Sequence, residues 1–484
     1  MKTIALLLQI IFVFQFSSLI AQNIELDKTL GLEYANQVAQ EMGVYQDEEM
    51  TEYINCVGQQ LVSQLEDKQF NYQFRIVPQV EPNAFALPGG YVFITTGLLS
   101  IIQSEDELAG ILAHEIIHAH NRHSISQMKK GILPKLLELP GELIGIISKD
   151  LGDIFNAPIK ASNALYLASY GRKKETEADL EGMDLAARAG YNPVALKAIL
   201  HRMTDVIELV TGEEEKKSYF SDHPYTPKRE SDIETKASFM IHGSTANKKE
   251  QYHQAIDGVL FGNSVTQGVF EGSEFMHPEL SIKVKFPDKW LLINQPEYFG
   301  GYSQDSRKGV VISIEEETEV MEASKKFIEK LSDKEKGHIS SKGFFPHREE
   351  NGYRISFAVK SKAQENYANI GWVKANGRVY RISNFSDDSS LKIFERVSVS
   401  LIALGDNDGE RIHTQKVAIV KVKAGETLKY LCKRNNNVAS LKLIEVLNDL
   451  KADDHLKEGQ GIKIVKKYAY TSEVKIHHDV KITE

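Results

Sequence analysis

The sequence feature that most constrains this chain is a His-Glu-x-x-His pattern, which runs from His114 to His118. A capping-box signature, Ser104-Glu-Asp-Glu107, precedes it, and apolar residues then recur at helical spacing, so we expect the pattern to lie within a helix. Because an α-helix turns by about 100° per residue, side chains four positions apart lie nearly over one another. The two imidazoles can therefore bind a single Zn²⁺, and Glu115 falls close enough to act on a metal-bound water.

A catalytic zinc site needs a third protein ligand as well as an open position for water. Three carboxylates occur together later in the chain, at Glu175, Glu177 and Asp179. On a helix Glu175 and Asp179 share a face, whereas Glu177 points roughly the opposite way. One carboxylate can bind the metal while a neighbour orients a ligand imidazole from behind, and spacing alone leaves both assignments open.

Four segments, taken in order, resemble the gluzincin metallopeptidases of family 48, the group of HtpX-, Oma- and BepA-like proteases. They are residues 83–99, residues 104–118 with Arg122-His123, residues 175–179 and residues 223–229. The resemblance implies that Glu175 is the third zinc ligand and that Asp179 stands behind the ligands. It also implies that His223 and Arg229 act on the charge that develops at the carbonyl oxygen, and that His223 can close the site by binding the zinc itself.

The chemistry implied by this resemblance is peptide hydrolysis. Zinc lowers the pKa of a bound water toward about 7, so that Glu115 can take its proton as general base and later return it to the leaving amine. We therefore predict a zinc metalloendopeptidase with one Zn²⁺ per chain.

One strand-like run could hold the substrate. It is rich in β-branched and aromatic residues and comprises Tyr91, Val92, Phe93, Ile94 and Thr95. An extended substrate could pair with this run as an added strand, or the run could be an ordinary core strand, and both interpretations stay open. His120 and His123 fall off the face that carries the two ligand histidines, so we expect them to be packing or surface groups.

Residues 1–21 are typical of an export signal. Lys2 precedes an apolar run, and small residues come before Gln22, where cleavage is expected. A membrane anchor is the alternative, but the run is shorter than the roughly 20 residues that a spanning helix needs. No later stretch is long and apolar enough to span a membrane. Cys56 and Cys432 are too few for a disulfide framework, and we expect two buried, unpaired thiols.

The expected fold class is multidomain. A mainly α (α+β) zincin-type metallopeptidase domain covers residues 22–262, a small α+β domain with an antiparallel sheet covers residues 263–405, and a linker covers residues 406–419. Residues 420–484 resemble a βααβ LysM module. Such modules commonly bind the glycan of peptidoglycan, and docking or a purely structural role is the alternative. The apolar stripe of residues 132–164 fits core packing, a lid over the zinc cleft, or a patch that touches membrane or client proteins.

Composition narrows the function further. The chain has 484 residues, of which 42% are hydrophobic and 26% charged, as in ordinary soluble proteins, and its net charge of −9 argues against a nucleic-acid binder. We predict export to a periplasm, at the outer membrane or cell wall, and cleavage of unfolded or misassembled envelope proteins in protein quality control. The outer-membrane assembly machinery and peptidoglycan are the other expected partners. The rival interpretations are a peptidoglycan-binding protein and an envelope chaperone or assembly factor whose zinc site His223 keeps mostly closed.

Overall fold

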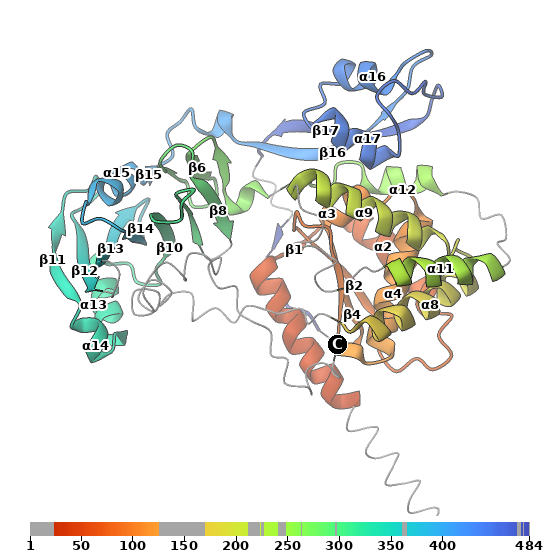
Figure 1. Ribbon diagram of the computed structural model, residues 1–484, viewed down its shortest axis with the longest axis horizontal. Helices are drawn as coiled ribbons and strands as arrows, with labels where there is room; N and C mark the ends of the chain where they lie inside the picture. Colours follow the sequence, from red (N-terminus) through yellow and green to blue (C-terminus); the bar gives the residue numbers. More distant parts are fainter. Residues whose placement is uncertain are drawn as a thin grey trace, which may run out of the picture.

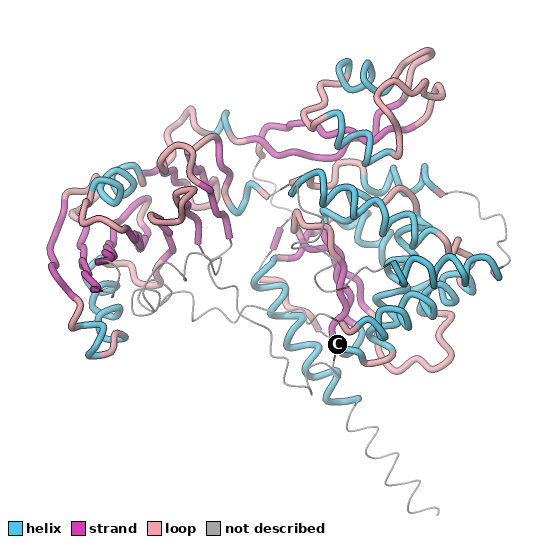
Figure 2. The backbone as a smooth tube through the Cα atoms, viewed as in Figure 1, coloured by secondary structure: helices cyan, strands magenta, loops and turns pink. Residues whose placement is uncertain are grey.

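The computed structural model describes residues 24–124, 170–211, 223, 227–240, 248–262, 264–295, 298–360, 365–471, 476–477 and 479–483. Figure 1 shows a mainly helical body, a strand-rich body and a small C-terminal unit, and Figure 2 separates helices from strands along the same trace. The expected export signal and the apolar stripe of residues 132–164 lie outside the described residues. Within the described ranges, no helix combines the length and apolar character that a membrane crossing requires.

In the helical body, helices surround a small sheet. Its elements are a helix over residues 24–42, β1 (Val44–Tyr45), α2 (Glu48–Val62), β2 (Gln73–Val77), β3 (Ala84–Leu87), β4 (Tyr91–Thr95), α3 (Thr96–Ile101), α4 (Glu105–His120), α8 (Arg172–Arg188), α9 (Ala195–Thr211), α11 (Pro227–Phe239) and α12 (Lys249–Ile256). The His-Glu-x-x-His pattern lies in α4. Ser104 caps the start of this helix, because its side chain accepts a hydrogen bond from the backbone nitrogen of Glu107. The carboxylate cluster lies in α8.

A glycine allows α8 to approach α4 closely. A Cβ atom at Gly182 would lie only 3.1 Å from the backbone nitrogen of His114, closer than a side chain tolerates without a shift. The absence of a side chain at this position therefore brings the carboxylates of α8 within reach of the imidazoles of α4.

The run expected to bind substrate is the central strand of its sheet. The strand order is β2-β4-β3, with β2 parallel to β4 and β3 antiparallel to it. Both edges of β4 are therefore hydrogen-bonded, and all of its residues are buried. The prediction that residues Tyr91–Thr95 pair with substrate is wrong, because an added strand needs an unpaired edge. The structure shows the alternative, an ordinary core strand.

The two cysteines are free thiols that differ in exposure. Cys432 is buried, as expected, but the same expectation is wrong for Cys56, which is exposed on α2. Helical periodicity explains the difference, because α2 turns Ile54, Val57 and Leu61 toward the core and leaves position 56 outside.

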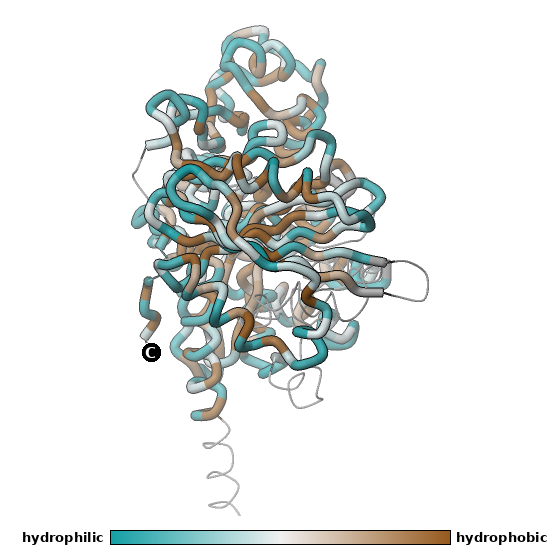
Figure 3. Tube along the Cα trace, turned by 90° about the vertical axis from the view of Figure 1, so that its left-hand side faces the viewer, coloured by the Kyte–Doolittle hydropathy of each residue, from teal (hydrophilic) through white to brown (hydrophobic). Residues whose placement is uncertain are grey.

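Antiparallel strands build the second body. Seven strands pair in the order β11-β12-β13-β14-β10-β9-β8, and four pair in the order β15-β7-β6-β5. The elements are β5 (Val269–Glu271), β6 (Glu274–His277), β7 (Ile282–Lys285), β8 (Leu291–Gln295), β9 (Tyr298–Tyr302), β10 (Gly309–Ile314), α13 (Val320–Lys330), α14 (Asp333–Lys336), β11 (Ile339–Phe345), β12 (Gly352–Lys360), β13 (Glu365–Ala375), β14 (Arg378–Ser386), α15 (Lys392–Ser400) and β15 (Ile402–Ala403). Hydrophobic and hydrophilic residues alternate along several of these strands in Figure 3. Successive residues of the large sheet point to opposite faces, and apolar residues on the two faces pack into separate clusters, one with α13 and the other with α15.

The C-terminal unit has the order strand, helix, helix, strand. It comprises β16 (His413–Lys421), α16 (Leu428–Arg434), α17 (Leu441–Asn448) and β17 (Gly461–Ala469), and β16 pairs antiparallel with β17. The second half of the expected linker 406–419 is therefore strand, because residues from His413 onward hydrogen-bond to β17. The unit begins earlier than the sequence suggested.

The C-terminal unit packs directly on the helical body, with which it shares one hydrophobic core. Its Lys463 side chain is fully buried, and Nζ donates hydrogen bonds to the carbonyl oxygens of Ser100, Ile101 and Ile102 at 2.8, 3.1 and 2.8 Å. These carbonyls end α3, immediately before the cap of α4. The buried Lys463 Nζ thus donates to carbonyls at the end of the helix that have no partner within it.

The chain leaves and re-enters the helical body at neighbouring points. The backbone nitrogen of Gly258 donates to the carbonyl of Val417 at 2.9 Å, and that of Val417 donates to Val259 at 2.9 Å. Near the C-terminus, β18 (Ile476–His477) pairs with β1. The first pairing brings together the two ends of the strand-rich segment, and the second joins the beginning of the chain to its end.

Candidate metal centre

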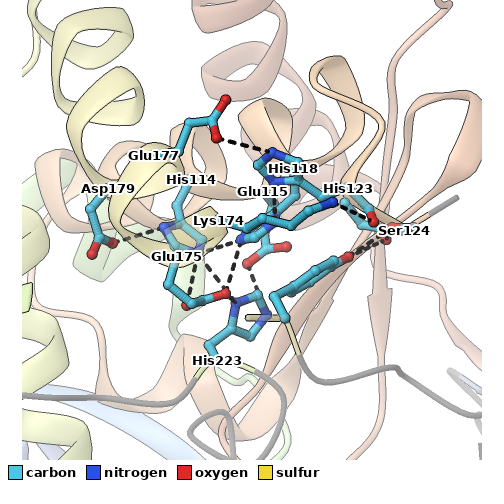
Figure 4. Close-up of polar contacts among 12 residues, drawn as sticks. His114, Glu115, His118, His123, Ser124, Lys174, Glu175, Glu177, Asp179 and His223 are labelled. Atoms are coloured by element: carbon cyan, nitrogen blue, oxygen red, sulfur yellow. Dashed lines mark hydrogen bonds and ion pairs between the residues drawn. The ribbon is translucent and has the colours of Figure 1, made fainter. Parts of the chain in front are cut away.

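Four buried side chains converge between α4 and α8 (Figure 4). His114 and His118 come from α4, Glu175 comes from α8, and His223 comes from a segment before α11. One ligand atom from each residue lies within 4.8 Å of the other three. The structure thus brings together the three predicted zinc ligands and the predicted closing histidine.

Imidazole nitrogens and one carboxylate oxygen meet at short distances in this cluster. Nε2 of His118 lies 2.9 Å from Nε2 of His114 and 3.3 Å from Oε1 of Glu175. Nδ1 of His223 lies 3.2 Å from both Nε2 of His114 and Oε1 of Glu175. Three imidazole nitrogens and one carboxylate oxygen, all buried, are a donor set that Zn²⁺ takes in proteins.

The protonation states also fit a cation at this point. Burial lowers the pKa of the His118 imidazole well below its ordinary value, so the ring is neutral and offers a lone pair. Burial alone would raise the pKa of the Glu175 carboxyl, but His223 and His118 hold it well below its usual range. A carboxylate and neutral imidazoles are the forms that bind metal.

Asp179 stands behind His114, where the family resemblance placed it. Its Oδ1 lies 3.0 Å from Nδ1 of His114, so that nitrogen carries the proton and Nε2 is left as a ligand atom. With a proton on Nδ1, the lone pair of His114 Nε2 points toward the facing nitrogen of His118, an arrangement that a cation between them stabilises. Burial raises the pKa of the Asp179 carboxyl, but hydrogen bonds from Arg229 and His114 lower it below its ordinary value.

Arg229 lies behind the ligands and does not face a substrate position. Its Nε and Nη2 each bind Asp179 at 2.7 Å, and its Nη1 lies 2.7 Å from Oε2 of Glu175. Nη1 also donates to the carbonyl of His223 at 3.1 Å. The guanidinium is 1% exposed and binds groups of the protein, so a role of Arg229 on the carbonyl oxygen stays a prediction.

Glu115 lies on α4 beside the cluster and is fully buried. Its Oε1 lies 3.5 Å from Nε2 of His223, the ring nitrogen that faces away from Glu175. The carboxylate thus borders the cluster without belonging to it, which is the position expected of a group that acts on water next to a metal.

The sequence interpretation missed two neighbours of His118. His123 was expected away from the site, yet its Nδ1 lies 2.9 Å from Nδ1 of His118. Helical spacing does not apply to it, because α4 ends at His120 and Arg122 turns the chain with a φ of 57°. Tyr170 stacks on the His118 ring with centroids 3.9 Å apart. The Arg122-His123 pair in the segments that resemble family 48 was a signal for His123. The sequence carries no comparable signal for Tyr170.

Comparisons with known proteins agree with this geometry. Residues 48–237 match the family described as Peptidase family M48. A beta-barrel assembly-enhancing protease from Yersinia pestis is 28% identical over 232 residues, which make up 47% of this chain and 47% of that protein. A putative beta-barrel assembly-enhancing protease from Vibrio cholerae is 32% identical over 181 residues, 36% of each chain. The mitochondrial metalloendopeptidase OMA1 of Schizosaccharomyces pombe is 30% identical over 192 residues, 38% of this chain and 52% of that protein. The chain spans about half or less of the length of these relatives.

Proposed function

Because residues 48–237 match the Peptidase family M48, we propose that the chain is a zinc-dependent endopeptidase that cleaves unfolded or misassembled proteins of the cell envelope. The observation that carries the proposal is the buried convergence of His114, His118 and Glu175 with Glu115 beside them. Zn²⁺ bound there would polarise the scissile carbonyl and make water a stronger nucleophile at neutral pH.

Glu115 is the general base in this proposal. It takes a proton from the attacking water and returns it to the nitrogen of the leaving amine. Asp179 keeps His114 in one tautomer and one orientation, and Arg229 holds Asp179 and Glu175 in place. His223 would then stabilise the negative charge on the carbonyl oxygen, once its ring has moved away from the other ligands.

His223 must move for catalysis, because four protein ligands leave no position for water. Three of the ligands sit on α4 and α8, whereas His223 lies in a bend outside the helices. We assign it the role of a latch that opens the site by withdrawing its imidazole.

An extended substrate would pair with β3 and not with β4. Among the described strands, β3 pairs only with β4, so it is the edge of the sheet beside α4. The carbonyl of Ala86 in β3 accepts hydrogen bonds from Ser124 Oγ at 3.1 Å and from Tyr170 Oη at 3.3 Å. Substrate would replace these two hydroxyl donors with its own backbone.

The relatives suggest the clients and the compartment. Two of them are named for beta-barrel assembly, and we extend this role to the present chain as an exported protein that works with outer-membrane assembly machinery. Binding of peptidoglycan by the LysM-like C-terminal unit stays a prediction. A second candidate function is an envelope chaperone or assembly factor. The position of His223 among the ligands favours it, because a metal with four protein ligands has no position for water and does not catalyse hydrolysis.

Casein cleavage by the zinc-loaded protein tests the proposal. Glu115→Gln should keep one zinc per chain, measured by mass spectrometry of the metal, and lose roughly 10²–10⁴-fold in rate, as expected when a general base is removed. His223→Ala should raise the rate if the histidine acts mainly as a latch, and should lower it if its contact with the carbonyl oxygen contributes more. His201→Ala is the matched control, because that imidazole is exposed and pairs with Asp205.

The outcomes separate the candidates. Cleavage by wild type that Glu115→Gln abolishes supports the peptidase. No cleavage by wild type, together with cleavage by His223→Ala, supports the chaperone with a closed site. Failure of both to cleave would contradict the peptidase proposal.

A further inference from the structure

The ring nitrogen of His118 that faces away from the cluster meets another imidazole. Nε2 of His118 faces the other ligands, and its Nδ1 lies 2.9 Å from Nδ1 of His123. His123 is 3% exposed, so water does not compete for this contact. Beyond it, Nε2 of His123 lies 3.8 Å from Oε2 of Glu177. In Figure 4 a dashed line joins the Glu177 side chain of α8 to the His123 ring.

A proton count assigns the donor in this contact. Two ring nitrogens 2.9 Å apart form a hydrogen bond only when one of them carries a proton and the other a lone pair. If Nε2 of His118 binds metal, its proton must sit on Nδ1, so His118 donates and Nδ1 of His123 accepts. The proton of His123 is then on Nε2, the nitrogen that faces Glu177.

The local backbone holds His123 in this place. Arg122, with its φ of 57°, turns the chain after α4 and binds Asp27 of the helix over residues 24–42, with Nη2 at 2.7 Å from Oδ1. Asn121 donates to Oε1 of Glu177 at 3.1 Å, and Lys174 donates to the carbonyl of His123 at 3.2 Å. Contacts from two other helices thus fix the segment that carries the imidazole.

We infer that His123 is a positioning residue, which keeps His118 in its metal-binding tautomer and orientation. The inference rests on the proposed zinc site. Each ligand imidazole of α4 then has its own support, a carboxylate for His114 and a neutral imidazole for His118. Glu177, the carboxylate beside His123, is 41% exposed. Its charge therefore stays in contact with water and is not added to the buried cluster.

Two substitutions separate hydrogen bonding from packing. His123→Leu removes the acceptor and keeps much of the volume, whereas His123→Asn can place its side-chain oxygen where Nδ1 was. His123→Leu should bind zinc roughly 10–100-fold more weakly than wild type in a chelator competition, and His123→Asn should recover most of that loss. His120→Leu is the matched control, since that imidazole lies 3.5 Å from Tyr72 Oη and away from the cluster.

Cobalt absorption supplies a second measurement that is independent of proteolysis. The visible bands of the Co²⁺-loaded protein should change in His123→Leu and stay as in wild type in His120→Leu. Wild-type affinity and spectrum in His123→Leu would overturn the inference, and so would equal losses in the Leu and Asn variants, which would indicate packing alone. If casein is not cleaved but these metal measurements hold, the peptidase proposal fails and this inference stands.

Discussion

Replacing Arg229 by methionine tests whether this residue positions the site or acts on substrate. Its guanidinium is 1% exposed and binds two buried carboxylates, Asp179 through two contacts and Glu175 through one, each at 2.7 Å. Removing one partner of a buried ion pair leaves an uncompensated charge and costs about 3–5 kcal/mol. Each kcal/mol lowers the Tm of a domain of this size by about 2–4 °C, so the zinc-free variant should melt about 6–20 °C below wild type.

Zinc should reduce that loss, because a dication beside Glu175 supplies part of the positive charge that methionine lacks. Calorimetric melts with and without zinc measure both effects. Lys228→Met is the matched control on the same helix, since its side chain is 77% exposed and its pair with Asp232 is a surface pair. The reasoning would be refuted if Arg229→Met melted within about 2 °C of wild type without zinc while losing its activity. That result would return Arg229 to the role on the carbonyl oxygen.

Three further predictions concern stability. Lys463→Met should lower the Tm by several degrees, because the buried carbonyls of Ser100 and Ile102 lose their Lys463 donor at about 1–3 kcal/mol each, whereas the Ile101 carbonyl keeps a hydrogen bond from Arg202. An unchanged circular dichroism melt would contradict this. Burial and neighbouring lysines lower the pKa of His253 to about 3, so the unfolded chain binds its proton first and stability is lost as pH falls from about 6.5 toward 3. Urea unfolding at a series of pH values should show a shallower loss for His253→Leu, and an equal slope would disprove the role of His253. Chelation of zinc should lower the Tm of wild type and of Glu115→Gln alike, because folding loses up to about 4 kcal/mol of binding free energy if free zinc stood at a thousand times its Kd. A shift in wild type alone would make Glu115 a ligand.

The parts of the site that could be predicted from sequence are those fixed by local helix geometry. His114 and His118 lie one helical turn apart, and Ser104 caps the helix that carries them, so short-range spacing sets their relation. Glu175 needed the family resemblance, because spacing within α8 allows more than one carboxylate to face the metal.

The errors came from relations that distant parts of the chain decide. Residues Tyr91–Thr95 were predicted to be a strand, and they are one, but the pairing of β2 and β3 on both edges depends on how the whole sheet assembles. His123 lies beyond the end of α4, where a single left-handed residue redirects the chain and helical spacing no longer holds. Arg229 was placed by analogy at a reacting atom, a role that stays a prediction, and its partners in the structure are side chains of α8 that the sequence separates from it by about 50 residues.

The hydrogen bonds of Gly258 and Val259 with Val417 show that the strand-rich body is an insertion into the helical body, which is its host. The host consists of residues 24–262 and the chain from β16 onward, and the pairing of β1 with β18 closes it a second time. An insertion whose two ends meet changes no distance that its host must span, so such a segment can be exchanged or lengthened without unfolding the parent. Selection could therefore vary the strand-rich body while the metal centre kept its geometry.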